Sequence, residues 1–460
     1  MASRSKTVAI IGSGVSGLGA AWLLDKEFDV TIYEAEPVLG GNAYTVDVPT
    51  SIGNVPMDMG VAFLRPWSYP NVHMLFGLLK VETFSGILDF GASFGPDDTW
   101  VTGRLLDSPL WKRIAPEASR FERQMLEVAN LPEPQQLLPI RHYIRQGGYS
   151  HEFVSKGLFP MLSSLVVTRE RLMEMPAQIV SALFQEYFSF FTPATWTFLR
   201  GGTRDFITRL SGGLKGRVRA STPVTSVTRA RDGVIVRDAR GGQAKYDQII
   251  LATTADVARR LLADPSADEI ELLETFEYQP STVYLHSDES ILSPYLPRST
   301  RLQYKYFGED AGPALRGMLT YNTGGAVGLD GVWMSIYGEN TEEPRPGAVL
   351  AMRQWGHLIV TPQSYAARTR LHQVQGVNRT WFCGAYTLFQ SHEAALVSGM
   401  AVAEQLGAEY PFADRPLAAR IYATLRGVMF PQPAREPPRV AAPRVSAPRR
   451  RPARMGRRVD

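Results

Sequence analysis

Four residues near the start of the chain have the types and the spacing of a phosphate-binding loop. Gly12, Gly14 and Gly17 follow the β-branched run of residues 8–11, and a stretch rich in alanine and leucine comes next. Gly12 suits a tight turn, Gly14 lets the backbone approach a diphosphate, and Gly17 lets a helix pack closely on the strand. The free amide groups and the dipole at the start of that helix favour bound phosphate. Glu34 ends the next strand, about 20 residues beyond the glycines, where its carboxylate suits a ribose hydroxyl and repels a 2′-phosphate.

A glycine pattern of this kind also occurs in tight turns that bind nothing. Here the strand, the helix, the second strand and the acid follow in the order that a dinucleotide site requires, so the sequence predicts such a site. No second fingerprint is present, which predicts one dinucleotide per chain. The seven histidines lack ligand spacing and there is one cysteine, so we expect no metal site.

The rest of the chain reads as alternating helical and strand regions around this loop. A helix is expected over residues 71–80, short strands with a hairpin over 84–102, and helices with apolar positions every three or four residues over about 110–195. Strand character returns over 217–254, and four strands of a mostly antiparallel sheet are expected at 282–286, 301–307, 317–321 and 332–337. A strand at 381–383, a glycine, a loop and a helix from about Glu393 complete the pattern. The predicted fold class is α/β with a second, discontinuous α+β domain.

One helical region is unusually rich in aromatic side chains. Between residues 173 and 199 these are Phe184, Tyr187, Phe188, Phe190, Phe191, Trp196 and Phe198. Three interpretations stay open at this point: an apolar substrate channel, a surface that presses on a membrane, or the core of a helical domain.

Length and composition describe an ordinary globular protein. The chain has 460 residues, of which 44% are hydrophobic and 20% charged, which is enough for two or three domains. No uninterrupted apolar run reaches about 18 residues, so we expect no membrane-spanning helix. The first strand begins too early for a signal peptide, and a lone Cys383 cannot form an internal disulfide. We therefore expect a cytoplasmic location.

The positive charge is concentrated at the C-terminus. Residues 431–460 hold nine arginines against Glu436 and Asp460, although the whole chain carries only +4. This Pro/Ala/Arg-rich tail has little to bury, and we expect it to be disordered in isolation. Weak contact with an anionic surface and simple solvation both fit it. Because no aromatic residue interleaves with the arginines, we expect no sequence-specific nucleic-acid binding.

Several motifs together resemble one superfamily. After Glu34 the pair Gly40–Gly41 resembles the E-x(5)-G-G continuation of flavoproteins in the amine oxidase and phytoene desaturase superfamily. The stretches VAIIGSGVSGLGAAWLL, DMGVAFLRPWSYPNVHMLF, FLRGGTRDFI, STPVTSV and NRTWFCGAY…HEAALVSGMAVAE are similar to a bacterial subgroup. That subgroup consists of predicted NAD/FAD-binding proteins with an amine oxidase domain, often encoded near cyclopropane fatty acid synthase. The similarity runs from about Thr7 to Leu406.

This resemblance implies a bound FAD and a division into domains. A Rossmann-like, GR2-type FAD-binding domain is expected from residues 1–80, 196–275 and 370–415. A substrate domain is expected from residues 81–195 and 276–369, followed by the disordered basic tail at 430–460.

The resemblance also implies which residues hold the cofactor. In that superfamily the D/E-x-G element, here Asp58 to Gly60, lies near the isoalloxazine ring, and the last helix points its N-terminus at the ring. Many members have an acid after the glycine of the last strand, whereas Ala385 follows Gly384 here. The full predicted cofactor-binding set is Gly12, Gly14, Ser16, Gly17, Glu34, Ala35, Gly40, Gly41, Asn42, Asp58, Gly60, Val224, Gly384, Ala385, Glu393 and Ala394.

The predicted catalytic set is His392, Glu393, Tyr386 and Lys305. His392 and Glu393 lie where the last loop meets the last helix, so one of them suits a general base; a helix-capping role is the alternative. Tyr386 fits either an aromatic wall beside the ring or ordinary packing. Lys305 is the candidate for the lysine that amine oxidases place beside the reactive flavin nitrogen, and a surface lysine is the alternative. Arg65 and Tyr69 are further candidates near the ring.

We therefore expect an FAD-dependent oxidoreductase, an oxidase, dehydrogenase or desaturase of an apolar, lipid-like or polyketide-like small molecule. Hydride passes to the flavin, and dioxygen or another electron acceptor reoxidises it. Three alternatives stay open: a redox-neutral double-bond isomerase, an amine oxidase, and a non-catalytic flavoprotein scaffold.

Overall fold

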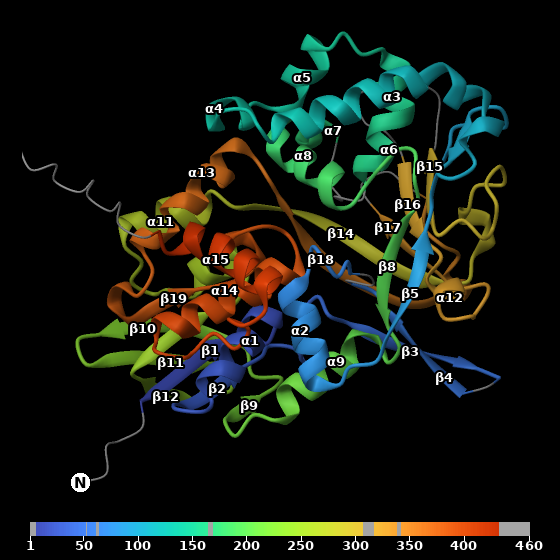
Figure 1. The fold of residues 1–460 in the computed structure, drawn as a ribbon. Helices are drawn as coiled ribbons and strands as arrows, with labels where there is room; N and C mark the ends of the chain where they lie inside the picture. Colours follow the sequence, from blue (N-terminus) through green and yellow to red (C-terminus); the bar gives the residue numbers. More distant parts are fainter. Residues whose placement is uncertain are drawn as a thin grey trace, which may run out of the picture.

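In the computed structural model, two large sheets and a layer of helices make up the molecule (Figure 1). The structure describes residues 6–51, 53–60, 64–163, 169–306, 317–337 and 342–431. The predicted tail beyond residue 431 lies outside the described residues. No described helix has the length and apolar character needed to cross a membrane.

The first sheet is parallel and has five strands in the order β19-β13-β1-β2-β9. These strands are β1 (Thr7–Ile11), β2 (Asp29–Tyr33), β9 (Arg217–Arg219), β13 (Gln248–Leu251) and β19 (Thr380–Phe382). Val8, Ala9 and Ile10 are fully buried, as expected for a parallel strand covered on both faces. Segments far apart in the sequence thus meet at one sheet, and the predicted α/β class is confirmed.

Helices pack around this sheet. They are α1 (Val15–Leu24), α2 (Pro70–Leu79), α9 (Gly202–Gly212), α10 (Ala255–Leu261), α11 (Ala267–Glu274), α13 (Pro362–Arg370), α14 (His392–Gln405) and α15 (Pro416–Met429). The first helix and α14 approach very closely, because a Cβ on Gly399 would lie 2.0 Å from the carbonyl oxygen of Ser16. This small-residue contact brings the last helix beside the N-terminal glycine loop.

The second sheet has seven strands in the order β18-β14-β17-β16-β15-β6-β7. These are β6 (Phe90–Ser93), β7 (Thr99–Val101), β14 (Glu277–His286), β15 (Leu302–Tyr306), β16 (Gly317–Tyr321), β17 (Trp333–Tyr337) and β18 (Val349–Ile359). The four strands expected between 282 and 337 are present, and their pairings with one another are antiparallel. The long edge strand β18 was not singled out from the sequence, and it pairs with β14 along its whole length.

The remaining strands of the described residues form three small sheets. They are β3 (Thr45–Thr50) with β4 (Gly53–Asp58), β5 (Thr83–Leu88) with β8 (Ala194–Leu199), and β10 (Val224–Ala230), β11 (Gly233–Asp238) and β12 (Gln243–Tyr246). The hairpin of β3 and β4 was not predicted from the sequence. The alternating partly buried pattern there is weak, which explains why the hairpin is hard to see in the sequence.

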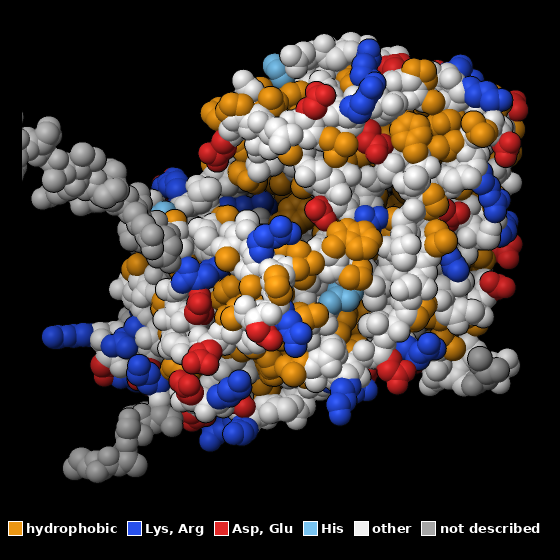
Figure 2. All heavy atoms as spheres, in the orientation of Figure 1, with side chains coloured by type: hydrophobic (Ala, Val, Ile, Leu, Met, Phe, Trp, Pro, Cys, Tyr) orange, Lys and Arg blue, Asp and Glu red, His pale blue; other side chains and the backbone are white. Residues whose placement is uncertain are grey.

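A helical layer covers one end of the seven-stranded sheet (Figure 1). It consists of α3 (Pro109–Val128), α4 (Glu133–Gln136), α5 (Ile140–Gln146), the π-helix η2 (Phe153–Leu158), α6 (Phe159–Leu162), α7 (Arg169–Glu174) and α8 (Ala177–Glu186). Figure 2 shows a hollow between this layer and the rest of the molecule, with hydrophobic side chains and charged side chains of both signs around it. Phe184 and Phe190 are buried in the layer against Phe121 and Phe153. For these two rings the core interpretation of the aromatic segment holds.

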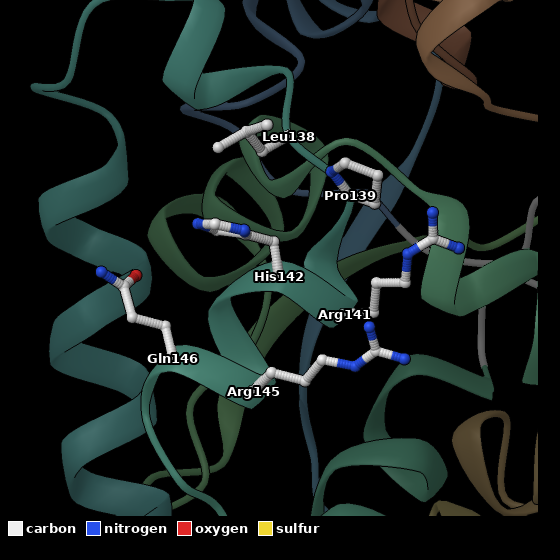
Figure 3. Close-up of a pocket in the computed structure, with 6 residues that line it drawn as sticks. All are labelled: Leu138, Pro139, Arg141, His142, Arg145 and Gln146. Carbon is white, nitrogen blue, oxygen red and sulfur yellow. The ribbon is translucent and has the colours of Figure 1, made fainter.

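Two polar features of this layer are structural in character. The first is a surface groove of about 470 Å³ at the start of α5, lined by Arg141, His142, Arg145 and their neighbours (Figure 3). In it, Arg141 forms an ion pair with Glu174.

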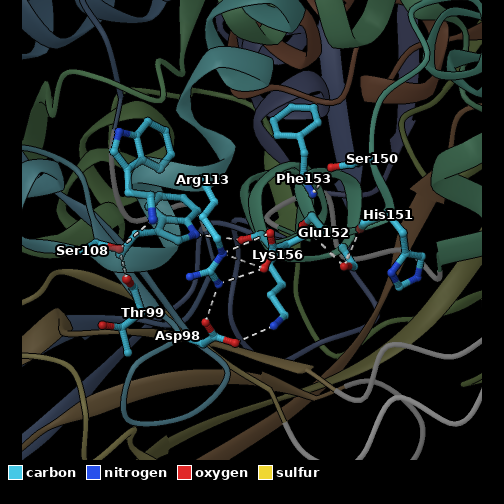
Figure 4. A network of polar contacts seen from close by, with 12 residues as sticks. Asp98, Thr99, Ser108, Arg113, Ser150, His151, Glu152, Phe153 and Lys156 are labelled. Atoms are coloured by element: carbon cyan, nitrogen blue, oxygen red, sulfur yellow. Dashed lines mark hydrogen bonds and ion pairs between the residues drawn. The ribbon is translucent and has the colours of Figure 1, made fainter.

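The second is a polar network that fastens the β6–β7 hairpin to the helices (Figure 4). Asp98 pairs with Lys156 of η2 and with Arg113 of α3, and Arg113 also pairs with Glu152. Ser108 begins α3 by accepting a hydrogen bond from the backbone N–H of Trp111 at 2.8 Å. The network therefore holds the helical layer in register on the sheet.

Candidate functional site

The N-terminal glycine loop forms a cradle at the start of α1. A Cβ on Gly12 would lie 2.6 Å from the carbonyl oxygen of Ala252, and one on Gly17 would lie 2.1 Å from that of Gly12. The φ angle of Gly12 is +101°, a conformation that other residues rarely adopt. Gly14, in contrast, has room for a Cβ: apart from its chain neighbours, no atom of the described residues lies within 4 Å of the Cβ position. The loop thus keeps open space directly in front of the first amide groups of a helix, where a diphosphate fits.

The second glycine pair closes one side of this cradle. Gly40 and Gly14 form a β-bridge, and the Gly40 N–H donates to the carbonyl oxygen of Ser13 at 3.1 Å. A Cβ on Gly41 would lie 3.3 Å from the Cα of Gly14. The predicted cofactor residues Gly14, Gly40 and Gly41 are therefore brought together.

Glu34 lies at the same end of the sheet. Its carboxylate accepts hydrogen bonds from the backbone N–H and the hydroxyl of Ser13, at 2.8 and 2.6 Å, and from the Glu36 N–H at 2.9 Å. The Thr222 N–H donates to the Glu34 carbonyl oxygen at 2.7 Å, so the segment that leads to Val224 meets the end of β2. Glu34, Ala35 and Val224 thus border one region beside the glycine loop.

Asp58 makes its contacts within the fold. Its carboxylate accepts hydrogen bonds from the Thr45 hydroxyl at 2.6 Å and from the Thr203 N–H and hydroxyl, both at 2.8 Å. Thr203 is in the first turn of α9, so Asp58 satisfies a free amide at that helix start. Burial raises the pKa of Asp58 above its usual range, and these hydrogen bonds oppose the shift. These contacts favour a structural role for Asp58, and direct contact with the cofactor stays a prediction.

Gly60 brings the two sheets together. A Cβ there would lie 1.9 Å from the Asn42 carbonyl oxygen and 2.9 Å from Cη2 of Trp355 on β18. On the same face of β18, the Arg353 guanidinium lies 4.0 Å from the centre of the Tyr44 ring. The edge strand of the second sheet therefore packs directly on the predicted cofactor segment 42–60.

This contact reveals residues that the sequence analysis missed. Trp355 and His357 share one face of β18 with Ser281 of β14, because Ser281 pairs with Trp355 in the register. Each carries a buried polar atom with no hydrogen-bond partner among the described residues: Trp355 Nε1, His357 Nδ1 and Ser281 Oγ. Burial lowers the pKa of His357 to about 4. Partly buried and exposed residues alternate along β18, but the exposed positions include Leu350 and Met352, so the sequence itself lacks the polar–apolar alternation that would have revealed this face.

The start of α14 contributes His392, Glu393 and Ala394. Ser391 is the N-cap, and its hydroxyl accepts the Ala394 N–H at 3.1 Å. His392 is 8% exposed and has no hydrogen-bond partner among the described residues. Burial lowers its pKa to about 4, so its imidazole is neutral near pH 7. A neutral imidazole without a partner is free to accept a proton.

Glu393 has a different environment. Its carboxylate accepts hydrogen bonds from the N–H and the side-chain amide of Asn71, at 3.0 and 2.6 Å, and from the Val72 N–H at 3.0 Å. It thereby satisfies the first free amides of α2 and ties that helix to α14. Burial raises its pKa to about 7. Both oxygens are engaged in capping, which favours the helix-capping role of Glu393 over that of a general base.

The remaining two catalytic candidates are held elsewhere. Tyr386 follows Gly384 and Ala385 in the short 3-10 helix η8 (Ala385–Thr387), and its ring packs edge-on against Phe276. Lys305 lies on β15, and its Nζ donates to the Ser290 carbonyl oxygen at 3.2 Å. Strands β16, β17 and β14 separate β15 from β18, which is on the order of 19 Å at the usual strand spacing. The structure therefore does not bring Lys305 together with the other candidates.

An aromatic wall runs from the outer surface toward α14; we define it as Trp67, Tyr69, Tyr187 and Trp196. Tyr69 packs edge-on against Tyr187, and Tyr187 stacks on Trp196 at 5.9 Å between ring centres. The Arg65 guanidinium lies between Trp67 and Trp196, at 5.1 and 4.8 Å from the ring centres. Burial raises the pKa of Tyr187 to about 12, and the nearby charge of Glu393 adds to this shift. The wall therefore ends next to the first turn of α14.

The sequence and the structure both match known flavoproteins. Residues 15–303 match the sequence profile of the flavin-containing amine oxidoreductases, and the chain belongs to this family. The fold is similar to that of a CLA-producing fatty acid isomerase from P. acnes, with a TM-score of 0.65, 15% identity, and coverage of 89% of this chain and 100% of that chain.

Two amine oxidases are similar to a comparable degree. Wild-type putrescine oxidase bound to putrescine has a TM-score of 0.64 and 13% identity, covering 87% of this chain and 98% of that chain. Cyclohexylamine oxidase from Brevibacterium oxydans has a TM-score of 0.62 and 15% identity, covering 88% and 100%. No curated protein sequence is similar enough to count as a relative.

The protein is accordingly an FAD-dependent oxidoreductase, and its predicted cofactor is confirmed at the level of the family. The open cradle at Gly14 fits the diphosphate of FAD.

Proposed function

We propose that this protein uses FAD to remove hydride from an apolar, lipid-like or polyketide-like substrate, and that dioxygen or another acceptor reoxidises the flavin. The aromatic wall carries the proposal, because stacked rings that lead to the start of α14 suit an apolar molecule. Two carboxylates lie near the wall: Glu393 is occupied by the amides of α2, and Glu186 accepts a hydrogen bond from the Ser68 hydroxyl and lies near the positive charge of Arg65. The wall therefore offers packing rather than a charged partner for an ammonium group.

Each residue has a distinct part in this proposal. The Gly14 loop holds the diphosphate and Glu34 the ribose, while Trp355 closes the site from the second sheet. FAD, when bound, supplies the hydride acceptor. His392 is the candidate base: its neutral imidazole takes the proton that the substrate loses together with the hydride. The aromatic wall excludes water and orients the substrate.

We also propose the division into a cofactor domain (1–80, 196–275 and 370–415) and a substrate domain (81–195 and 276–369). All five strands of the parallel sheet come from the first set, and all seven strands of the second sheet come from the other. Helix α15 extends the cofactor domain beyond 415, since the Asn71 side chain donates to the Ala418 carbonyl oxygen at 3.2 Å.

Anaerobic titration of the purified holoenzyme tests the proposed function. A panel of lipids, polyketides and amines is mixed with the protein, flavin bleaching is followed, and product masses are measured. We expect an apolar compound to bleach the flavin and to yield a product lighter by two hydrogens. Bleaching by amines alone identifies an amine oxidase, and a product of unchanged mass identifies an isomerase. A flavin that no compound reduces or converts points to a scaffold, and each of these three outcomes contradicts the proposal.

A further inference from the structure

Arg368 is a buried cation without a counter-ion. It lies on α13, only 2% of its surface is exposed, and its Nε donates to the Tyr386 carbonyl oxygen at 3.1 Å. Both terminal nitrogens, Nη1 and Nη2, are buried with no hydrogen-bond partner in the described part of the chain. No carboxylate of the described residues forms an ion pair with it. A guanidinium in this state is rare, because burying an unpaired charge is strongly unfavourable.

The charge persists at neutral pH. Burial lowers the pKa of Arg368 to about 10, which leaves the guanidinium protonated at pH 7. The nearest compensation is weak: the guanidinium lies 5.7 Å from the centre of the Tyr365 ring. A ring face attracts a cation but accepts no strong hydrogen bond from Nη1 or Nη2. The fold therefore leaves these donors without partners.

The chemistry of the absent partner follows from these donors. Arg368 offers two nitrogens in a rigid fork, and Tyr386, to which it is bonded, has a buried hydroxyl that also lacks a partner among the described residues. A group that accepts hydrogen bonds from a guanidinium fork and cancels its charge is a bidentate oxyanion. Among oxyanions, a carboxylate offers two oxygens in one plane, which match the planar fork of a guanidinium.

The position of Arg368 connects it to the candidate site. Tyr365, beside it, lies near Gln178 in the first turn of α8, so α13 meets the helical layer at this point. Tyr278 of β14 also lies near Arg368, and its Cβ packs against Gly356 on the face of β18 opposite to Trp355 and His357. Through its hydrogen bond to Tyr386, which follows the predicted cofactor residues Gly384 and Ala385, Arg368 is joined to the end of β19 where the cofactor is expected.

We propose that Arg368 binds the carboxylate of the substrate, so that the substrate is an apolar molecule with an anionic head. This inference rests on the proposed function and narrows its substrate class. The other candidate oxyanion, the FAD diphosphate, already has its cradle at Gly14 after β1. Arg368 instead lies by Tyr386, which follows β19, two strands away from β1 in the sheet.

Ligand titration with matched probes tests this inference. Dodecanoate and dodecan-1-ol, which share an alkyl chain, are titrated into the holoenzyme, and perturbation of the flavin spectrum gives each Kd. We expect dodecanoate to bind more tightly than the alcohol. R368Q should weaken dodecanoate binding about thirtyfold or more and change alcohol binding little. The control is R370Q, because Arg370 is on the same helix, exposed, and paired with Glu271; it should change neither Kd.

The alternative outcomes are distinct. If the wild type binds both probes equally and R368Q changes neither, the inference fails and the proposed function stands. If neither probe binds, both fail. If R368Q loses FAD but keeps the preference for dodecanoate, Arg368 serves the diphosphate and the inference fails. R368M checks folding, since replacing an unpaired buried charge by an apolar side chain should leave the melting temperature of the ligand-free protein unchanged or higher. A large drop would reveal an internal partner and would overturn the inference.

Discussion

Substitution of Gly14 by alanine separates cofactor binding from folding. Gly14 is the N-cap of α1, with φ −61° and ψ 170°, which alanine adopts without strain. Its Cβ would meet no atom of the described residues within 4 Å. Alanine lowers the conformational entropy of the unfolded chain, which stabilises the folded protein by about 0.4–1 kcal/mol. Alanine is also a poorer N-cap than glycine, and this destabilises the helix by a similar amount. The ligand-free stability of G14A should therefore lie within about 1 kcal/mol of the wild type.

The effect on FAD should be large. The added methyl group occupies the open space in front of the helix amides, where the diphosphate must lie against the backbone. At 100 times the Kd, FAD stabilises the wild type by about 2.7 kcal/mol, and G14A should lose most of this gain. The assay is chemical unfolding of the apoprotein with and without excess FAD, together with flavin retention on a desalting column.

Two other glycines supply matched controls. G17A should destabilise the protein even without FAD, because its Cβ would lie 2.1 Å from the Gly12 carbonyl oxygen. G212A, near the end of α9, should change neither property, since no described atom lies within 4 Å of that Cβ position. Wild-type FAD affinity in G14A would refute the assignment of this loop to the diphosphate. Unfolding of ligand-free G14A would refute the geometric argument itself.

Three further substitutions test the residues around the site. H392Q should lower the rate of flavin reduction, measured by stopped flow, about 100-fold without loss of FAD. Because burial lowers the pKa of His392 to about 4, the rate of the wild type should not change through titration of this residue between about pH 6 and 8. The pKa of Glu393 is raised to about 7 from 4.5, so the folded state binds the proton more tightly and stability falls as pH rises between these values; urea unfolding of E393Q should lack this slope, and an unchanged slope would exclude Glu393 as its source. D58A should cost about 1–3 kcal/mol in the same assay, more than D47A, whose carboxylate pairs with Arg204 at the surface; equal effects would contradict the capping role of Asp58.

The cofactor half of the site is readable from sequence because its residues are local. Gly12, Gly14 and Gly17 lie within one turn, and Glu34 follows at the end of the adjacent strand, so spacing alone places them together. The same local logic predicts the bounds of β1 and α2, the end of β2 and the start of α14 to within one or two residues of those observed. In these segments, strand and helix periodicity and the final packing agree.

The substrate half depends on long-range contacts that spacing does not encode. Trp355 reaches Gly60 only because β18 pairs along β14 and lays its edge on the cofactor segment. Lys305 was an equal candidate in the sequence, yet strand order puts its strand β15 four positions away from β18, with three strands between them. Glu393 has the type of a base, but its function depends on α2, whose amides it caps from more than 300 residues away. Strand order and helix contacts, rather than residue type, decide these roles.

The unfavourable features of the fold gather where ligands are expected. Gly14 keeps space that a side chain would fill without strain, His392 keeps a buried neutral imidazole, and Arg368 keeps a buried charge without a counter-ion. The unpaired charge of Arg368 lowers the stability of the ligand-free chain, whereas elsewhere the same fold satisfies a comparable group, as Glu269 does for Arg229. FAD would fill the space at Gly14 and an anionic substrate would satisfy Arg368, at positions contributed by α1 and α13. Binding of FAD and of an anionic ligand should therefore each raise the stability of this protein, and the two gains should depend on different arginine and glycine positions.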